Sequence, residues 1–219
     1  MSAKGTLYIL SAPSGGGKSS LIAGLLERFN LDDKLRLSIS HTTRDMRPGE
    51  VDGQSYFFVN EEEFKALIER GAFLEYAQVF DRYYGTSREV VQQWLDEGRD
   101  VLLDIDWQGA RNIRAQMPGC VSIFIVPPSL EELRHRLEKR QRDTPEVIDQ
   151  RMELAKREIS HYREYDYVVV NDKYDNALVQ LRGIILARRC LLEKQEEARH
   201  ELFENLLAGY IDPESSTEA

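Results

Sequence analysis

The feature that most constrains the fold is an apolar hexapeptide that leads into a glycine-rich loop and then into a helical pattern. Residues 6–11 read TLYILS, which is typical of a strand buried on both faces of a parallel sheet. The loop at 12–20 reads APSGGGKSS, and apolar residues recur at helical spacing from Lys18 to Phe29. Strand, loop and helix in this order predict an α/β fold.

The loop itself predicts a phosphate site. It matches the Walker A pattern at Gly17, Lys18 and Ser19, although Ala12 stands where the pattern has its first glycine. Successive glycines let backbone N–H groups converge on one anion, and the N-terminus of the following helix adds positive partial charge. The alternative, a tight turn with an exposed lysine, does not explain the strand before the loop and the helix after it. We expect ATP to bind here through Ser14, Gly15, Gly16, Gly17, Lys18, Ser19 and Ser20.

Further along the chain, short apolar runs alternate with helical patterns, which favours a parallel sheet flanked by helices, as in P-loop NTPases. We expect a loop over 41–55 and a capping box at Asn60 and Glu63. The other expected strands are 35–40, 56–59, 73–80, 101–105, 121–126 and 167–170, the last three of these buried. The other helices are expected to begin near Ser87, Gln108, Ser129, Pro145 and Asp175, the last continuing as a charged amphipathic pattern over 191–207.

Two acids end the apolar run VLLDI, at Asp104 and Asp106. In a parallel sheet the carboxyl ends of the strands face the ligand crevice, so Asp104 is expected to hold Mg²⁺ together with Ser19, directly or through water. The alternative is that the acids cap the helix that follows. For Asp106 the capping role and a role in ligand binding remain equally open.

A polar loop, HTTRDMRPGE, carries Arg44 and Arg47 three residues apart, and Tyr56 follows it. Two guanidinium groups and a phenol suit a phosphate monoester, which binds several charge-assisted donors at once. A solvated basic loop is the alternative, and composition alone does not separate the two.

Composition excludes some classes of partner. The formal net charge is −9 and the isoelectric point about 5.1, so the chain as a whole does not attract nucleic acid or anionic lipid. The two cysteines, Cys120 and Cys190, show no metal or redox spacing. The apolar run 7–10 is too short for a signal sequence, and no later run is long enough to span a bilayer. We therefore expect a cytoplasmic protein.

Several motifs together resemble the guanylate kinase family in order and spacing, from about Gly5 to Leu191. They are SAPSGGGKSSL, the arginine loop with TTRDMRPGE, FLEY, YYGTS, LDIDWQG, an arginine pair at Arg136 and Arg140, and VVND. The long C-terminal helical pattern resembles the bacterial members of that family.

This resemblance implies an enzyme that phosphorylates GMP and dGMP with ATP and Mg²⁺ in purine nucleotide metabolism. It implies that Arg44, Arg47, Tyr56 and Tyr84 bind the GMP phosphate. It also implies that Ser40, Glu75 and Thr86 bind guanine and that Asp106 belongs to the GMP site. Asn171 is implied to lie near the adenine of ATP. A carboxylate at Glu75 matches the paired donors N1–H and N2–H₂ of guanine and leaves adenine unpaired. Taken alone, Glu75 is typical of a solvent-facing position and Thr86 of a helix cap.

The resemblance also implies that Arg136, Arg140 and Arg151 are catalytic, together with Lys18, Arg44 and Asp104. The three lid arginines would spread positive charge over the transferring phosphoryl group. Without the family, a salt-bridged surface around Glu132 is the favoured interpretation of Arg136. Gln141 and Lys173 depart from the common family pattern, which has glycine and an acid there.

We therefore expect a nucleotide-binding core at 1–38, 89–128 and 159–207. A GMP-binding subdomain is expected at 39–88, a helical lid at 129–158 and a disordered tail at 208–219. Two other functions conflict with the sequence. A non-catalytic scaffold of the same fold conflicts with the retained Lys18 and lid arginines, and a P-loop GTPase conflicts with the absence of an NKxD-type guanine motif. We expect small-molecule substrates only. The C-terminal helix can pack either on its own core or on a second subunit, which leaves a homo-oligomer open.

Overall fold

The computed structural model describes residues 4–29, 34–79, 81–139 and 144–210. Its main sheet, sheet A, has five strands in the order β2-β7-β1-β8-β9, and every neighbouring pair is parallel. This confirms the predicted α/β fold. The strands are β1 (Leu7–Ser11), β2 (Leu35–Leu37), β7 (Asp100–Asp104), β8 (Val121–Val126) and β9 (Tyr167–Val170).

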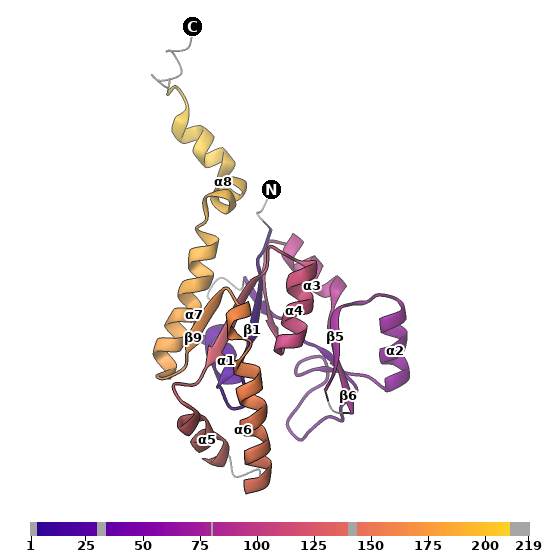
Figure 1. Ribbon diagram of the computed structural model, residues 1–219. Helices are drawn as coiled ribbons and strands as arrows, with labels where there is room; N and C mark the ends of the chain where they lie inside the picture. The colour runs from indigo at the N-terminus through magenta and orange to yellow at the C-terminus, as the bar shows by residue number, and fades with distance from the viewer. Residues whose placement is uncertain (1–3, 30–33, 80, 140–143, 211–219) are drawn as a thin grey trace.

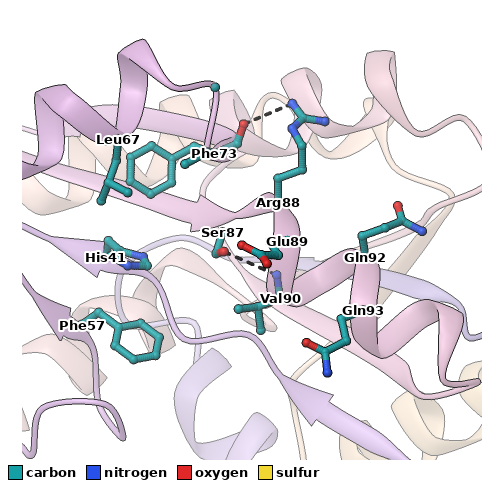
Figure 2. A pocket seen from close by; sticks show the side chains of 12 residues that line it. His41, Phe57, Leu67, Phe73, Ser87, Arg88, Glu89, Val90, Gln92 and Gln93 are labelled. Carbon is teal, nitrogen blue, oxygen red and sulfur yellow. Dashed lines mark hydrogen bonds between the residues drawn. The ribbon is translucent and has the colours of Figure 1, made fainter.

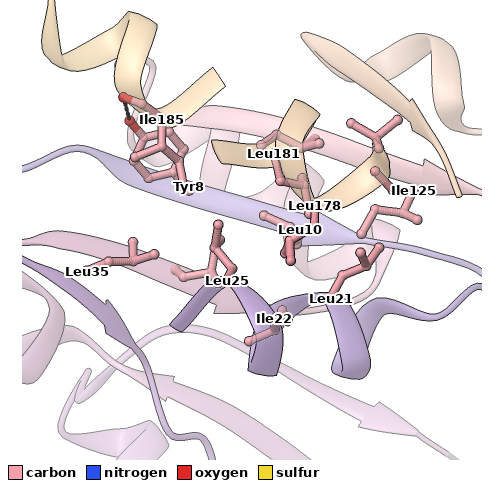
Figure 3. Packing of buried hydrophobic residues seen from close by; sticks show 14 of the residues in the cluster. Tyr8, Leu10, Leu21, Ile22, Leu25, Leu35, Ile125, Leu178, Leu181 and Ile185 are labelled. Atoms are coloured by element: carbon pink, nitrogen blue, oxygen red, sulfur yellow. Dashed lines mark hydrogen bonds between the residues drawn. The ribbon is translucent and has the colours of Figure 1, made fainter. Parts of the chain in front are cut away.

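The alternation of side chains along β1 builds a core on each face of sheet A. Tyr8 and Leu10 point to one face, where they pack with α1 (Lys18–Phe29) and α7 (Tyr174–Arg189), as Figure 3 shows. Leu7 and Ile9 point to the other face, against α3 (Arg88–Asp96) and α4 (Trp107–Gln116). Because β1 is covered on both faces, the loop that follows it starts from a rigid position.

A second sheet, sheet B, lies beside the core (Figure 1) and has the order β4-β3-β6-β5. Its strands are β3 (His41–Thr42), β4 (Phe57–Phe58), β5 (Phe73–Val79) and β6 (Arg82–Ser87), and α2 (Glu61–Glu69) packs on it through Phe64. The capping box predicted at Asn60 and Glu63 is present with both hydrogen bonds. The short β3 and the whole of β6 were not predicted, because RYYGTS lacks an apolar run.

The helices α5 (Leu130–Lys139) and α6 (Pro145–Ile159) form a separate pair, placed below sheet A in Figure 1. They pack through their own apolar cluster, which consists of Leu133, Leu137, Ile148, Met152 and Ala155. A short 3₁₀ helix at 162–164 follows α6 and leads to β9.

The C-terminal region corrects two predictions. The expected long helical pattern is two helices, α7 and α8 (Leu192–Leu207), which are separated at Cys190 and Leu191. Helix α8 has no buried residue and extends away from the core in Figure 1. The strand at 167–170 was predicted as buried, but three of its four residues are exposed because β9 is the edge of sheet A.

Most of the expected tail, 211–219, lies outside the described residues. No helix in the described part of the chain is long and apolar enough to cross a membrane.

Candidate active site

The glycine-rich loop has the backbone shape of an anion nest. Gly15 and Gly17 have φ values of +90° and +91°, which favour glycine over all other residues. A Cβ atom at Gly17 would collide with the side chain of Asn171, which donates from Nδ2 to the Gly16 carbonyl at 2.9 Å. Asn171 is buried and follows β9, so the end of one strand fixes the loop that begins at another.

Lys18, the first residue of α1, reaches across to the end of β7. Its Nζ lies 2.5 Å from Asp104 Oδ1 and donates to the Ile105 carbonyl at 3.2 Å. The parallel pairing of β1 with β7 sets Leu10 opposite Asp104, and this register places the acid beside the loop. Asp104 therefore lies at the carboxyl ends of the parallel strands, where the sequence predicted it. Ser14, Ser19 and Ser20 are exposed on the same loop and first helical turn.

A second acid, Glu158 near the end of α6, also contacts the loop. The backbone N–H of Ser14 donates to Glu158 Oε2 at 3.1 Å. Burial raises the pKa of Glu158, while the Ser14 N–H and nearby Lys18 act in the opposite direction. Sequence reasoning missed this residue, because nothing local distinguishes it from the other charged residues of α6.

A cavity of about 350 Å³ opens beside the loop. Arg136 from α5 lines it and donates from Nη2 to the Asn171 carbonyl at 3.0 Å. Its Nε also pairs with Glu132 at 2.8 Å, so the ion pair weighed as the surface alternative is present as well. The complete lining is Gly15, Gly17, Ser20, Arg136, Lys139, Asn171, Asp172 and Tyr174. Lys139 and Tyr174 were not predicted to line a site.

The predicted acceptor-phosphate residues gather on sheet B and its loop. The Arg44 guanidinium lies 5.2 Å from the centre of the Tyr56 ring, and the Tyr56 and Tyr84 ring centres are 6.1 Å apart. Glu50 holds Arg44 through a 2.7 Å contact from Nη2, and this hydrogen bond raises the pKa of the arginine. Glu50 also accepts from the Arg47 backbone N–H at 2.8 Å, while the residue Arg47 is exposed. That Glu50 positions this loop was not predicted.

Glu75 and Thr86 face each other across β5 and β6. The Thr86 hydroxyl donates to Glu75 Oε1 at 2.8 Å, and Glu75 is only 7% exposed, so the solvent-facing alternative is wrong. The helix cap is Ser87, not Thr86. Burial is the main cause that raises the pKa of Glu75 to about 7, and Asp106 adds to it.

Asp106 caps helix α4, since its Oδ1 accepts from the Gly109 N–H at 2.9 Å. The capping role of Asp106, which the sequence left open, is therefore present. Space between Glu75 and α4 is tight, because a Cβ atom at Gly109 would lie 2.9 Å from Glu75 Oε2. Asp106 thus begins the helix against which the Glu75 carboxylate rests.

The remaining predicted residues are less constrained. Ser40 is half-buried directly before β3, and Arg151 is half-buried on α6. Arg140 lies outside the described residues, so the structure does not test the predicted arginine pair.

A second cavity, of about 740 Å³, lies on the opposite face of sheet B. Figure 2 shows His41, Phe57 and Phe73 on one side of it and Val90 and Gln93 from α3 on the other. None of the predicted site residues lines it. A register irregularity between Phe73 and Glu75 explains the separation, because it lets Phe73 share a face with Ser87 while Glu75 shares the other with Thr86.

The chain matches known proteins over nearly its whole length. The family model for guanylate kinase matches residues 4–188. The chain is 57% identical to a guanylate kinase from Escherichia coli K12 over 206 residues, which are 94% of this chain and 99% of that protein. It is 58% identical to one from Vibrio parahaemolyticus over 205 residues, with 94% and 99% covered.

A solved structure agrees with this. The crystal structure of a guanylate kinase from Anaplasma phagocytophilum superposes with a TM-score of 0.72 at 35% identity, covering 90% of this chain and 96% of that one. The motifs, the parallel sheet with its P-loop, and relatives above 50% identity agree, and the chain belongs to the guanylate kinase family of nucleoside monophosphate kinases.

Proposed function

We propose that this enzyme transfers the γ-phosphoryl group of ATP in line to the phosphate of GMP or dGMP, without a covalent intermediate. Its family phosphorylates GMP, with ATP as the phosphate donor. The observation that carries the proposal for this chain is the buried Glu75 carboxylate, which is held by Thr86 in a protein that also has a P-loop. A buried carboxylate beside a hydroxyl matches the donor edge of guanine.

The ATP phosphates bind the nest from Ser14 to Ser20, with Lys18 on the β- and γ-phosphates. The positive φ values of Gly15 and Gly17 support this role, since such glycines are typical of loops whose N–H groups bind an anion. Asn171 borders the cavity beside the loop, which leaves room for the nucleoside. Lys18 stabilises the charge that moves from the γ-phosphate to the leaving ADP.

Mg²⁺ binds through Ser19 and Asp104, directly or through water. The donors fit, because a hydroxyl and a partly exposed carboxylate beside a phosphate loop are ligands that Mg²⁺ would use together with water and phosphate oxygens. Among the described residues no group of three acid, histidine or cysteine side chains forms a metal cage, which agrees with a metal held mainly by the nucleotide. When bound, the ion neutralises phosphate charge during transfer.

The phosphate of GMP binds Arg44, Arg47, Tyr56 and Tyr84. The clustering of Arg44 with the two tyrosine rings supports this, and the contact with Glu50 orients the guanidinium before the substrate arrives. Ser40, Glu75 and Thr86 bind guanine, and Asp106 contributes from the start of α4. Its cap bond holds the Asp106 carboxylate in a fixed position.

Three units move relative to one another in this proposal: the core (1–38, 89–128 and 159–207), the GMP-binding subdomain (39–88) and the lid (129–158). The separate apolar cluster of α5 and α6 supports an independent lid. Its arginines Arg136, Arg140 and Arg151 close over the phosphates and help to exclude water. We also propose a cytoplasmic location, which suits the two free cysteines, and small-molecule partners. The apolar residues exposed on α8 support a homo-oligomer through that helix.

The test is Lys18→Ala, with Lys65→Ala as its control. Lys65 lies on α2, where it pairs with Glu61 on the surface. Loss of Lys18 is expected to lower kcat for GMP phosphorylation by about 10²–10³-fold, the range found for single electrostatic groups in active sites. The control is expected to keep its rate. Near-normal turnover by a folded Lys18→Ala protein would overturn the assignment of the P-loop.

A further inference from the structure

Two anion-binding groups of the P-loop are already paired with carboxylates of the protein itself. The Ser14 N–H donates to Glu158 at 3.1 Å, and the Lys18 ammonium contacts Asp104 at 2.5 Å. Asp104 is a neighbour on sheet A, but Glu158 comes from α6, a helix packed outside the sheet. The Glu158 contact therefore links the P-loop to the α5–α6 pair.

The position of Glu158 on α6 makes this link specific. Met152 and Ala155 are buried against α5, and Glu158 follows Ala155 by three residues, which places it on the same face of the helix. That face carries the apolar cluster up to Ala155 and then the carboxylate. Any movement of α6 relative to the core must break or stretch the contact with Ser14.

The surroundings of Glu158 stabilise its carboxylate only weakly, so the contact with the Ser14 N–H can be broken. Burial raises the pKa of Glu158, and the negative charge of Asp106 raises it further. Only the Ser14 N–H and the more distant Lys18 favour the charged form, and Lys18 is already paired with Asp104. The P-loop N–H thus replaces some of the hydration that the carboxylate loses, and a better anion can displace it.

We propose that Glu158 is an internal competitor of the ATP phosphates, which occupies the P-loop until the triphosphate displaces it and releases the α5–α6 pair. This inference rests on the proposed ATP site. One N–H cannot donate fully to a carboxylate and a phosphate oxygen at once. A phosphate bound at the Ser14 N–H would also lie beside the Glu158 carboxylate, and the two negative charges repel. Glu158 therefore lowers the affinity for ATP and links ATP binding to the position of the helices that carry Arg136 and Arg151.

The experiment is a titration of the full chain with ATP, ADP and AMP by isothermal calorimetry, in the absence of GMP. Glu158→Gln keeps the shape of the side chain and removes its charge. Glu153→Gln is the matched control, because Glu153 is on the same helix but pairs with Lys156 on the surface. We expect Glu158→Gln to tighten ATP binding by about tenfold, as removal of one like-charge contact allows. The control stays within about twofold of the wild type.

The three nucleotides separate competition from a general effect on folding. AMP lacks the β- and γ-phosphates, so its affinity is expected to stay within about twofold in Glu158→Gln. Should Glu158→Gln fail to fold, Glu158→Asp replaces it: the shortened acid withdraws from Ser14, and ATP binding is expected to tighten by a smaller factor. Unchanged or weaker ATP binding in the folded variant would overturn the proposal, and so would equal tightening for AMP.

Lys18→Ala, titrated in parallel, separates this inference from the proposed function. Loss of ATP binding in Lys18→Ala together with unchanged binding in Glu158→Gln would reject the competitor and leave the ATP site in place. ATP binding that is insensitive to Lys18→Ala would reject both proposals.

Discussion

At the scale of single residues, Glu75 shows what the sequence could not reveal. In the run FLEY its neighbours predict a strand, and alternation gives no reason to bury the acid. The register irregularity after Phe73 turns the carboxylate toward Thr86 and α4. Burial then raises its pKa to about 7, and this couples a residue proposed to bind guanine to the stability of the fold.

The raised pKa predicts a pH-dependent difference in stability between the wild type and Glu75→Gln. The folded-state pKa of about 7 lies above the ordinary value of 4.5. The contribution of Glu75 protonation to the free energy of unfolding is therefore fully present below pH 4.5 and is lost as pH rises through 7. The loss amounts to about 3 kcal/mol. Glutamine does not titrate, so Glu75→Gln is expected to gain most of this amount relative to the wild type between pH 5 and pH 8.

Urea unfolding of both proteins at the two pH values measures this difference. All other titrating groups are common to the two proteins, so their contributions cancel when the free energies of unfolding are subtracted. A difference that stays constant from pH 5 to pH 8 would show that Glu75 titrates normally and is not desolvated.

Other residues divide by whether their signal is local in sequence. Lys18 and Asp104 were predicted at this sheet edge, because strand order and loop pattern place them there, and the structure brings them into contact. Glu50 and Glu158 were not predicted as partners of the site. Glu50 contacts Arg44 within one loop, and Glu158 contacts the distant P-loop from α6, so the sequence neighbours of these charged residues do not encode the contacts.

At the scale of elements, periodicity predicted α1 and β8 with their observed bounds, since both have dense apolar patterns. It missed β6, whose polar and aromatic residues owe their strand conformation to pairing with β5. It also joined α7 to α8, because no glycine or proline marks the break at Cys190. Strand 167–170 was placed correctly, but its exposed residues follow from the strand order of the sheet, which the sequence did not specify.

The start of α4 allows two roles of one residue to be separated. Asp106→Asn keeps a side-chain oxygen that can accept from the Gly109 N–H, whereas Asp106→Ala removes it. We expect Asp106→Ala to lose about 1 kcal/mol of stability and Asp106→Asn much less. Both are expected to raise the KM for GMP, because both remove the charge proposed to face the substrate.

Denaturant unfolding and GMP kinetics of the two variants provide the check. Equal stability of the asparagine and alanine proteins would mean that the cap contributes nothing measurable. An unchanged KM in both would limit Asp106 to its structural role.

At the scale of the whole molecule, sheet A carries an apolar cluster on each face and the α5–α6 pair carries its own, while α2 stacks on sheet B through Phe64. Sheet A and its helices bury β1 on both faces, while α5 and α6 bury their contact separately. The division into core, GMP-binding subdomain and lid, like the relative motion of the three parts, stays a prediction. Helix α8 adds no buried residue to any of these clusters.

The central claim is that this molecule joins an ATP site to a site selective for GMP. The most direct test is a coupled assay of ADP formation by the wild-type chain with Mg²⁺, ATP and one acceptor at a time: GMP, dGMP, AMP or UMP. We expect rapid ADP formation with GMP and dGMP and a kcat/KM for AMP and UMP lower by about 10²-fold or more, since neither base satisfies a buried carboxylate as guanine does. Equal rates with AMP and GMP, or ADP formation that does not depend on GMP, would contradict it.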